Sequence, residues 1–211
     1  MARKGKLITF EGIDGSGKST QIRLLTQALK RDEIPFLLAR EPGGTPVGES
    51  IREILLNSAH REMDAVTELF LFEAARAQLI RDLIRPALDA GKLVLLDRFT
   101  DSTVAYQGYG RGLGVDRVTA LNDAATSGLI PDRTFLLDLP AEEGIDRMRR
   151  SRPGKSDRLD TEGLDFTRRV REGYLEVARQ SAERVTVIDA LRPIEAIESD
   201  IYGKIREDLV L

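Results

Sequence analysis

The chain has 211 residues, of which 41% are apolar and 32% charged, and its formal net charge is −3. This length suits one globular domain spanning residues 1–211, and the slightly negative charge argues against a general nucleic-acid binder. Because the sequence has no cysteine, it excludes disulfides, thiolate metal sites and a cysteine nucleophile. We find no signal-like or membrane-spanning apolar run, so we expect a cytoplasmic protein without membrane contact.

Short apolar runs alternate with longer helical patterns, which is typical of an α/β domain with a mainly parallel sheet. The strands that we expect are residues 7–10, 36–39, 93–96, 134–139 and 185–188. The helices that we expect are 18–31, 47–56, 65–90 with a break or kink at Pro86, 115–126, 141–150, 163–182 and 193–207. Since ligands bind beyond the carboxyl ends of the strands in such sheets, the residues after each strand are the site candidates.

The first strand leads into residues 12–19, GIDGSGKS, which fit the phosphate-binding pattern G-x-x-x-x-G-K-[ST]. The glycines let backbone N–H groups turn toward an anion, and the helix that follows adds its positive end. Lys18 is spaced to reach the β- and γ-phosphates of a nucleoside triphosphate, and Ser19 to ligate Mg²⁺. A glycine-rich turn of another kind is the alternative. The dinucleotide fingerprint fits less well, because its glycines run G-x-G-x-x-G.

Asp97 and Arg98 follow the third strand. Asp97 occupies the position of a carboxylate that acts near Mg²⁺, and the alternative is a helix N-cap or turn aspartate. Arg98 either clamps a second phosphate through two N–H groups or lies exposed at the surface. Two anion-binding devices favour a small-molecule phosphotransferase with two phosphate-bearing substrates. A switch GTPase would need an N-K-x-D motif, which this sequence lacks.

An arginine-rich segment follows the fourth strand and its helix. Its cations are Arg147, Arg149, Arg150, Arg152, Lys155 and Arg158. Charge runs are usually solvated faces, but this run is interior, and Pro153 and Gly154 interrupt any helix. A bound polyphosphate would relieve its mutual repulsion. We therefore favour a short mobile lid, about residues 147–160, over a solvated loop.

Two further polar groups are candidates for nucleobase recognition. Phe72 and Arg76 are spaced i, i+4, so a ring and a guanidinium share one helical face. Spacing alone favours the other interpretation, in which Phe72 belongs to the core and Arg76 lies at its rim. The second group is Ser102, Thr103, Tyr106 and Gln107. Ser102 and Tyr106 share a face if that segment is helical.

Taken together, these motifs resemble the thymidylate kinase family of nucleoside-monophosphate kinases. The matching segments run in order along essentially the whole chain: residues 10–21 (FEGIDGSGKSTQ), 40–45 (REPGGT), 72–78 (FEAARAQ) and 97–108 (DRFTDSTVAYQG). The last is the most specific, because P-loops are widespread. The resemblance implies a three-layer P-loop kinase fold with a five-stranded parallel sheet. It also implies a homodimer and transfer of the γ-phosphoryl of ATP to dTMP with Mg²⁺.

The resemblance implies roles for single residues as well. Phe72 would stack on thymine, Arg76 would hydrogen-bond its far edge, and Arg98 would hold the dTMP phosphate. Asp14 would lie near the sugar 3′-hydroxyl, and Tyr106 would crowd the 2′ position. The implied ATP-side residues are Gly12, Asp14, Gly15, Ser16, Gly17, Lys18, Ser19, Thr20 and, beside adenine, Arg192. The implied dTMP-side residues are Asp14, Glu41, Pro42, Phe72, Arg76, Arg98, Ser102, Thr103, Tyr106 and Gln107.

Members of the family differ in where the catalytic arginine lies. Some carry it in the P-loop after the aspartate, but that position is Gly15 here, so the role would pass to the lid. The Asp157-Arg158 pair resembles the end of a bacterial-type lid. The implied catalytic residues are Lys18, Asp97, Arg98, Arg158 as first lid candidate and Arg152 as second, with Ser19 and Asp97 on Mg²⁺. A P-loop kinase for another nucleotide or deoxynucleoside, or a non-catalytic ATP-binding module, remains the alternative.

Overall fold

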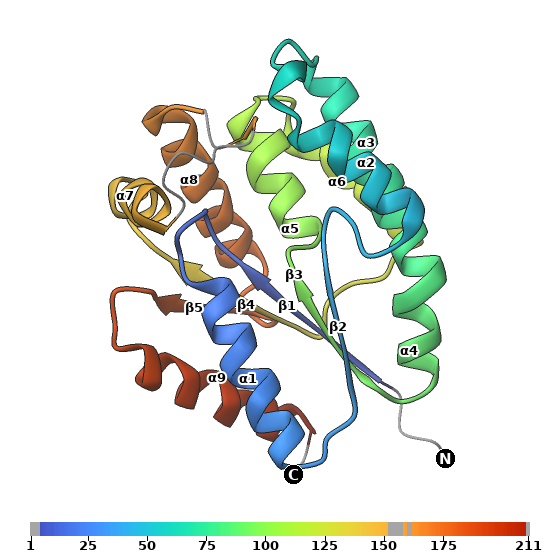
Figure 1. Ribbon diagram of the computed structural model, residues 1–211, viewed down its shortest axis with the longest axis vertical. Coiled ribbons are helices and arrows are strands. Elements are labelled where there is room, and N and C mark those ends of the chain that lie inside the picture. Colours follow the sequence, from blue (N-terminus) through green and yellow to red (C-terminus); the bar gives the residue numbers. More distant parts are fainter. Residues whose placement is uncertain (1–4, 152–157, 160–161, 210–211) are drawn as a thin grey trace.

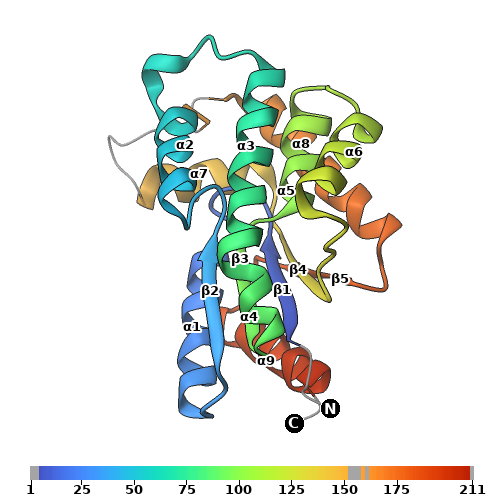
Figure 2. The ribbon, with the colours of Figure 1, turned by 90° about the vertical axis from the view of Figure 1, so that its right-hand side faces the viewer.

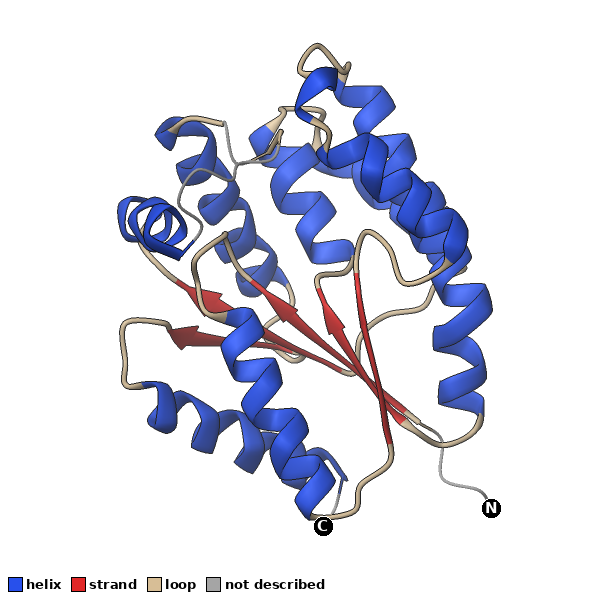
Figure 3. Cartoon of the chain, in the orientation of Figure 1, coloured by secondary structure: helices blue, strands red, loops and turns tan. Residues whose placement is uncertain are grey.

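The computed structural model describes residues 5–151, 158–159 and 162–209. At its centre lies a five-stranded, wholly parallel sheet in the order β2-β3-β1-β4-β5 (Figure 3). The strands are β1 (Lys6–Glu11), β2 (Phe36–Arg40), β3 (Leu93–Asp97), β4 (Arg133–Asp138) and β5 (Val185–Asp189). The predicted α/β class and parallel sheet are confirmed, and every predicted strand end lies within one residue of the observed end.

Helices cover both faces of the sheet, which makes three layers (Figure 1). On one face lie α1 (Lys18–Arg31) and α9 (Ile194–Leu209), and on the other lie α4 (Arg85–Asp89) and α8 (Leu164–Gln180). The period-2 alternation of strand side chains explains this arrangement, because neighbouring residues point to opposite faces. Ile8 and Leu95 pack with the α1 and α9 side, whereas Leu7 and Val94 pack with the α4 side.

The remaining helices lie around the carboxyl edge of the sheet. They are α2 (Pro46–Leu56), a 3₁₀ turn (Ser58–His60), α3 (Ala65–Leu79), α5 (Thr100–Thr103), α6 (Val115–Thr126) and α7 (Ala141–Ser151). None of the helices in the described parts of the chain is long and apolar enough to cross a membrane.

The predicted break near Pro86 is present, but it lies upstream of the proline. A π-helical stretch, Ile80–Ile84, joins α3 to α4, and the three form one rod in front of the sheet (Figure 2). Proline has no N–H, and its ring excludes the carbonyl of the residue four positions earlier. A widened turn before Pro86 accommodates both effects.

Residues 100–110 form a second irregular helix. The short α5 passes directly into a π-helical stretch, Val104–Gly110, that packs against α8. A Cβ at Gly110 would lie 2.8 Å from the Phe166 ring, so glycine permits the close approach. Motif-bearing residues of the sequence therefore lie on a π-helix, which often occurs at functional sites.

Register brings the motifs together. Asp97 at the end of β3 is level with Phe10 of β1 and Arg40 of β2. The segments that follow these three strands therefore meet at one edge of the sheet. Because β1 lies between β3 and β4, this edge is also the point where the strand order reverses, the usual place for a ligand in such sheets.

Candidate active site

A pocket with a volume of about 440 Å³ lies at this edge, between the P-loop, the segment after β2, α3, the end of β3 and α7. The predicted residues that line it are Asp14, Gly15, Gly17, Lys18, Ser19, Thr20, Glu41, Pro42, Phe72, Arg76, Asp97, Arg98, Ser102, Thr103, Tyr106 and Gln107. Side chains from five separate segments thus converge on one cavity.

The pocket also contains residues that were not among the predicted site residues. They are Arg40, Arg52 and Leu56, and, within the predicted lid segment 147–160, Arg147, Ser151 and Leu159. Arg147 belongs to the arginine-rich segment, so its charge was visible in the sequence. Arg52 belongs to no motif and is brought to the pocket by α2, where its guanidinium donates to the Pro42 carbonyl at 2.9 Å.

The P-loop has the backbone that its glycines predict. Gly12, Gly15 and Gly17 have φ values of 136°, 79° and 96°, a region that L-side chains rarely adopt. Lys18 Nζ donates to the carbonyl oxygens of Gly12 and Ile13, both at 3.0 Å, so the lysine folds back along its own loop. Burial, with the nearby charge of Arg98, lowers the pKa of Lys18 to about 8.

Gly15 makes room for α7. A Cβ at Gly15 would lie 2.4 Å from the carbonyl oxygen of Gly144, and a Cβ at Gly144 would lie 2.8 Å from the carbonyl oxygen of Asp14. The backbone of α7 therefore packs directly on the loop. Three residues along α7 from Gly144, Arg147 lines the pocket. The helix that excludes a side chain at position 15 also supplies a cation nearby.

Ser19 and Asp97 form the candidate metal position. Ser19 Oγ lies 3.4 Å from Asp97 Oδ2, and both residues line the pocket. In the parts of the chain that the structure describes, no three His, Cys, Asp or Glu side chains gather into a metal cage. One hydroxyl and one carboxylate beside a phosphate site fit Mg²⁺, which usually keeps waters and binds substrate phosphates.

Arg98 lies between the P-loop and the helical segment after β3. Its NH1 donates to the Gly12 carbonyl at 3.1 Å and the Tyr174 hydroxyl at 2.9 Å. Its NH2 donates to Asp14 Oδ1 at 2.9 Å and the Tyr106 hydroxyl at 3.1 Å. Although burial alone would raise the pKa of Asp14, the charges of Arg98 and Lys18 hold it well below its usual value. Arg98 is thus a firmly held cation in a phosphate-sized pocket.

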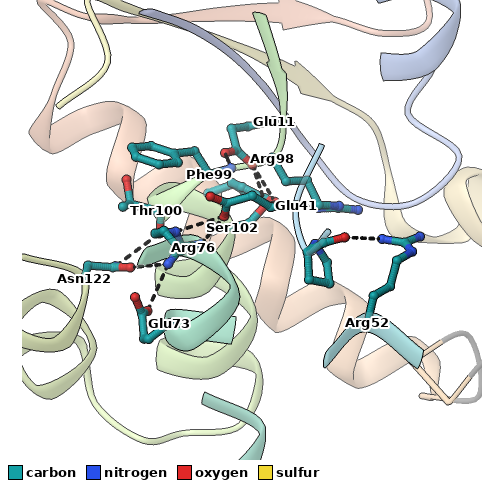
Figure 4. Close-up of polar contacts among 12 residues, drawn as sticks. Glu11, Glu41, Arg52, Glu73, Arg76, Arg98, Phe99, Thr100, Ser102 and Asn122 are labelled. Atoms are coloured by element: carbon teal, nitrogen blue, oxygen red, sulfur yellow. Dashed lines mark hydrogen bonds and ion pairs between the residues drawn. The ribbon is translucent and has the colours of Figure 1, made fainter. Parts of the chain in front are cut away.

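Arg76 is fixed in a buried ion network (Figure 4). The side chain is 1% exposed. Its Nε and NH2 donate to Glu41 Oε2 at 2.9 and 2.6 Å, and NH1 donates to Glu73 Oε1 at 2.9 Å and Asn122 Oδ1 at 2.7 Å. Spacing alone favoured Phe72 in the core and Arg76 at its rim. That interpretation is wrong, because Phe72 is half-buried in the pocket wall and Arg76 is buried.

Four of the predicted residues do not line the pocket. Gly12 and Ser16 belong to the P-loop itself. Arg192 pairs with Asp200 at 2.8 Å after β5. Arg158 is 4% exposed and donates to the Leu55 carbonyl at 2.9 Å and to Glu68 at 2.5 Å. Its guanidinium thus contacts α2 and α3 rather than the phosphate position.

Arg152, the second lid candidate, lies outside the described residues, as do Lys155 and Asp157. Among the cations of the arginine-rich segment that the structure describes, Arg147 lines the pocket.

Fold and site together define a P-loop phosphotransferase whose pocket joins the phosphate loop to an arginine-lined wall. The family model for thymidylate kinase matches residues 10–201. The chain is 50% identical over 194 residues to the thymidylate kinase of Kosmotoga olearia, covering 92% of each protein. It is 48% identical to that of Symbiobacterium thermophilum, covering 96% of this chain and 93% of the relative.

A solved structure agrees with these sequence relatives. The crystal structure of thymidylate kinase from Ehrlichia chaffeensis superposes with a TM-score of 0.77 at 34% identity, covering 96% of this chain and 99% of that one. The chain belongs to the thymidylate kinase family, which consists of ATP-dependent nucleoside-monophosphate kinases.

Proposed function

We propose that residues 1–211 act as one catalytic domain in which the P-loop holds ATP and Arg98 holds the phosphate of dTMP for direct transfer of the γ-phosphoryl group. One observation carries the proposal. Arg98 donates to the P-loop carbonyl of Gly12 and to Asp14 of the same loop. An acceptor phosphate bound to Arg98 therefore lies next to the phosphates that the loop binds, as in-line transfer requires.

On the ATP side, the loop N–H groups and the start of α1 would bind the phosphates. Lys18 would exchange its bonds to Gly12 and Ile13 for oxygens of the β- and γ-phosphates. Ser19 and Asp97 would hold Mg²⁺, which when bound supplies positive charge to the transferring group. Thr20 adds a further hydroxyl beside Ser19. Arg192, which follows β5, is the candidate for contact with the adenine of ATP.

On the dTMP side, Phe72 would offer its ring to the base, and Arg76 would offer a hydrogen bond. The four bonds of Arg76 within the described network use four of the five N–H groups that a guanidinium carries. One N–H group is left for a base oxygen. Glu41 would act by holding Arg76, and Pro42, Ser102, Thr103 and Gln107 would complete the wall.

Asp14 and Tyr106 would contact the sugar. They are hydrogen-bonded to each other at 3.0 Å, and both bond Arg98. A sugar 3′-hydroxyl can donate to the Asp14 carboxylate, whereas the Tyr106 ring fills the space that a 2′-hydroxyl would need. This pairing supports a preference for deoxynucleotides.

Transfer to a phosphate needs no strong general base, because the attacking oxygen is already anionic. The chain must instead stabilise charge and exclude water. We favour Arg147 for the transition-state charge, since it lines the pocket. Arg158 would first have to leave Glu68, and Arg152 remains a candidate by its place in the sequence.

We also propose a homodimer that uses α2 and α3. The exposed stripe of α3 consists of Thr67, Phe70, Ala74 and Ala77, without a charge, and Phe70 is 54% exposed. An exposed helical stripe without charges, with a large exposed aromatic ring, suits contact with another protein surface. Sedimentation of the protein and of Phe70→Glu tests this: the wild type is expected to be dimeric, and a monomeric wild type would refute it.

A coupled assay of ADP release tests the proposed reaction over a panel of acceptors. We expect turnover with dTMP to exceed turnover with UMP, CMP, AMP, GMP and thymidine. Turnover with dTMP no faster than with water, alongside activity on another acceptor, would favour a different P-loop kinase. ATP binding without any phosphorylated product would favour the non-catalytic module.

A further inference from the structure

A buried carboxylate lies beneath the dTMP phosphate position and has no part in the reaction described above. Glu11, the last residue of β1, is 0% exposed. Its Oε1 accepts from the Phe99 N–H at 2.7 Å, and its Oε2 accepts from the Ser102 hydroxyl at 2.5 Å (Figure 4). The Tyr174 hydroxyl donates to the same Oε2 at 3.0 Å. Glu11 thus binds donors from the turn after β3, from α5 and from α8.

These contacts join Glu11 to Arg98 through two hydroxyls. Ionised Glu11 can only accept, so at least one of the Ser102 and Tyr174 hydroxyls points its proton toward it. The two hydroxyl oxygens also lie 2.7 Å apart, so one hydroxyl can donate to the other instead of to Glu11. In either arrangement both oxygens keep a lone pair that accepts from Arg98, whose NH1 lies 2.9 Å from the Tyr174 oxygen and 3.3 Å from Ser102 Oγ.

Glu11 also holds the backbone of Arg98. Arg98 has a φ of 72°, a left-handed conformation that non-glycine residues rarely adopt. The Phe99 N–H that Glu11 binds is the next donor along the chain. One carboxylate therefore fixes both the strained turn and, through two hydroxyls, the side chain that the turn carries.

Charge supports the same arrangement. Arg98 lies between two carboxylates, with Asp14 on the pocket side and Glu11 on the buried side. Burial, with the nearby charge of Asp101, raises the pKa of Glu11 to about 7. At pH 8 the group is ionised and can order both hydroxyls. Neither Glu11 nor Tyr174 lines the pocket, so neither touches the substrate.

We propose that Glu11 and Tyr174 are positioning residues that hold Arg98, partly through Ser102, in the orientation that binds the acceptor phosphate. The proposal rests on the proposed function, in which Arg98 binds the dTMP phosphate. It predicts that removing a single hydroxyl outside the pocket weakens dTMP binding and leaves ATP binding unchanged.

The experiment measures dissociation constants for dTMP and for ATP by calorimetry at pH 8. Tyr174→Phe removes the hydroxyl and keeps the ring, and we expect dTMP to bind roughly three- to tenfold more weakly, with ATP affinity within about twofold. The matched control is Tyr202→Phe, since the Tyr202 hydroxyl also donates to a carboxylate, Asp32, but on the opposite side of the sheet. We expect this control to bind both ligands like the wild type.

Glu11→Gln is the second variant, and we expect a loss in dTMP affinity of roughly tenfold or more. Glutamine has one accepting oxygen, so its NH₂ group opposes either the Phe99 N–H or the two hydroxyls. Thermal unfolding of each variant separates a folding defect from a binding defect. If Glu11→Gln does not fold, Tyr174→Phe decides the question alone.

Arg98→Ala separates the failure of this proposal from that of the proposed function. If Arg98→Ala leaves dTMP affinity intact, the role of Arg98 itself is refuted. If it weakens dTMP while Tyr174→Phe behaves like Tyr202→Phe, the positioning proposal is refuted and the function stands. In the double variant, Tyr174→Phe should add less than about twofold to the loss from Arg98→Ala, and full additivity would mean that Tyr174 acts independently.

Discussion

The two halves of the pocket differ in how much of their structure the protein itself completes. On the proposed dTMP side, Arg76 and Arg98 bond to carboxylates, hydroxyls and carbonyls from several elements. On the ATP side, Lys18 bonds to carbonyl oxygens of its own loop, and Ser19 meets Asp97 at a long 3.4 Å. We call the proposed dTMP side the acceptor half and the ATP side the donor half. The acceptor half is held in place by the protein before any ligand binds, whereas phosphates and metal complete the donor half.

Electrostatics explains why the acceptor half must be built in advance. Arg76 is buried and Arg98 is partly buried, and a charge removed from water is tolerated when it is paired and hydrogen-bonded. Arg76 accordingly lies between Glu41 and Glu73, whose pKa values are raised by burial despite its charge. Burial opposes the charge of Lys18 and lowers its pKa to about 8, so the removal of that charge should cost little stability. Substitutions in the acceptor half should therefore reduce both the stability of the protein and its affinity for dTMP. Substitutions in the donor half should mainly reduce kcat.

The largest expected effect is that of Lys18→Ala. Removing one preorganised cation from the transferring phosphoryl group should lower kcat on the order of 10²-fold or more. The melting temperature should hardly fall, because burial already disfavours the charged form. The coupled assay and thermal unfolding measure both quantities. A kcat within a few-fold of wild type would contradict the role of the P-loop lysine.

Arg76→Ala tests the acceptor half. It leaves Glu41 and Glu73 buried without their cation, so we expect a loss of about 3–5 kcal/mol in unfolding free energy. Binding of dTMP should weaken roughly tenfold to a hundredfold, with ATP binding preserved. The control is Arg81→Ala on the same helical rod, whose side chain is 82% exposed. Unchanged stability and dTMP affinity in Arg76→Ala would contradict the claim that the acceptor half is held in place by its own ion network.

Arg147→Ala tests which lid-side cation reaches the transition state. We expect kcat to fall on the order of tenfold with dTMP affinity intact, since the charge acts on the transferring group. Arg149 on the same helix is 75% exposed, and its replacement by Ala should change neither value. Arg158→Ala, if Arg158 anchors α2 and α3, should lower the melting temperature. A larger fall in kcat for Arg158→Ala than for Arg147→Ala would restore Arg158 as the catalytic lid residue.

A smaller effect is expected for Gly15→Ala. Its φ of 79° and the contact with Gly144 both oppose a side chain, so α7 must move away from the loop. Gly128→Ala is the matched control, with a φ of 71° and open space around its Cβ. Gly128→Ala should lose about 1–2 kcal/mol of stability and Gly15→Ala more, because α7 must also move, but kcat should fall, a few-fold, in Gly15→Ala alone. Equal kcat values in Gly15→Ala and Gly128→Ala would show that catalysis does not depend on the close packing of α7 on the loop.

The sequence predicted those site residues whose position follows from a short motif next to a strand end. Lys18, Ser19, Asp97 and Arg98 follow strand ends, so the parallel sheet was enough to bring them together. Phe72 reached the pocket as its motif implied, but the burial of Arg76 did not follow from spacing. Its partner Glu41 lies 35 residues away.

The missed residues depend on packing between distant elements. Arg52 and Tyr174 come from helices that no motif marks, and their contacts follow from how α2 and α8 pack. Arg147 was named in the arginine-rich segment, but its place in the pocket follows from how α7 packs. Arg158 pairs with Glu68, 90 residues away, which sequence spacing does not reveal. The fold was easier to predict because strand and helix periods are local. The π-helix Val104–Gly110, which the sequence did not reveal, packs against α8.

The most direct test of the central claim is titration of dTMP into the protein alone and into the protein saturated with Mg²⁺ and a non-hydrolysable ATP analogue. If the acceptor half is built in advance, dTMP binds in both cases, and its dissociation constant changes by less than about threefold, a small coupling between sites. If dTMP binds only after the ATP analogue, or becomes more than about tenfold tighter with it, the acceptor half is not preformed and the account is wrong.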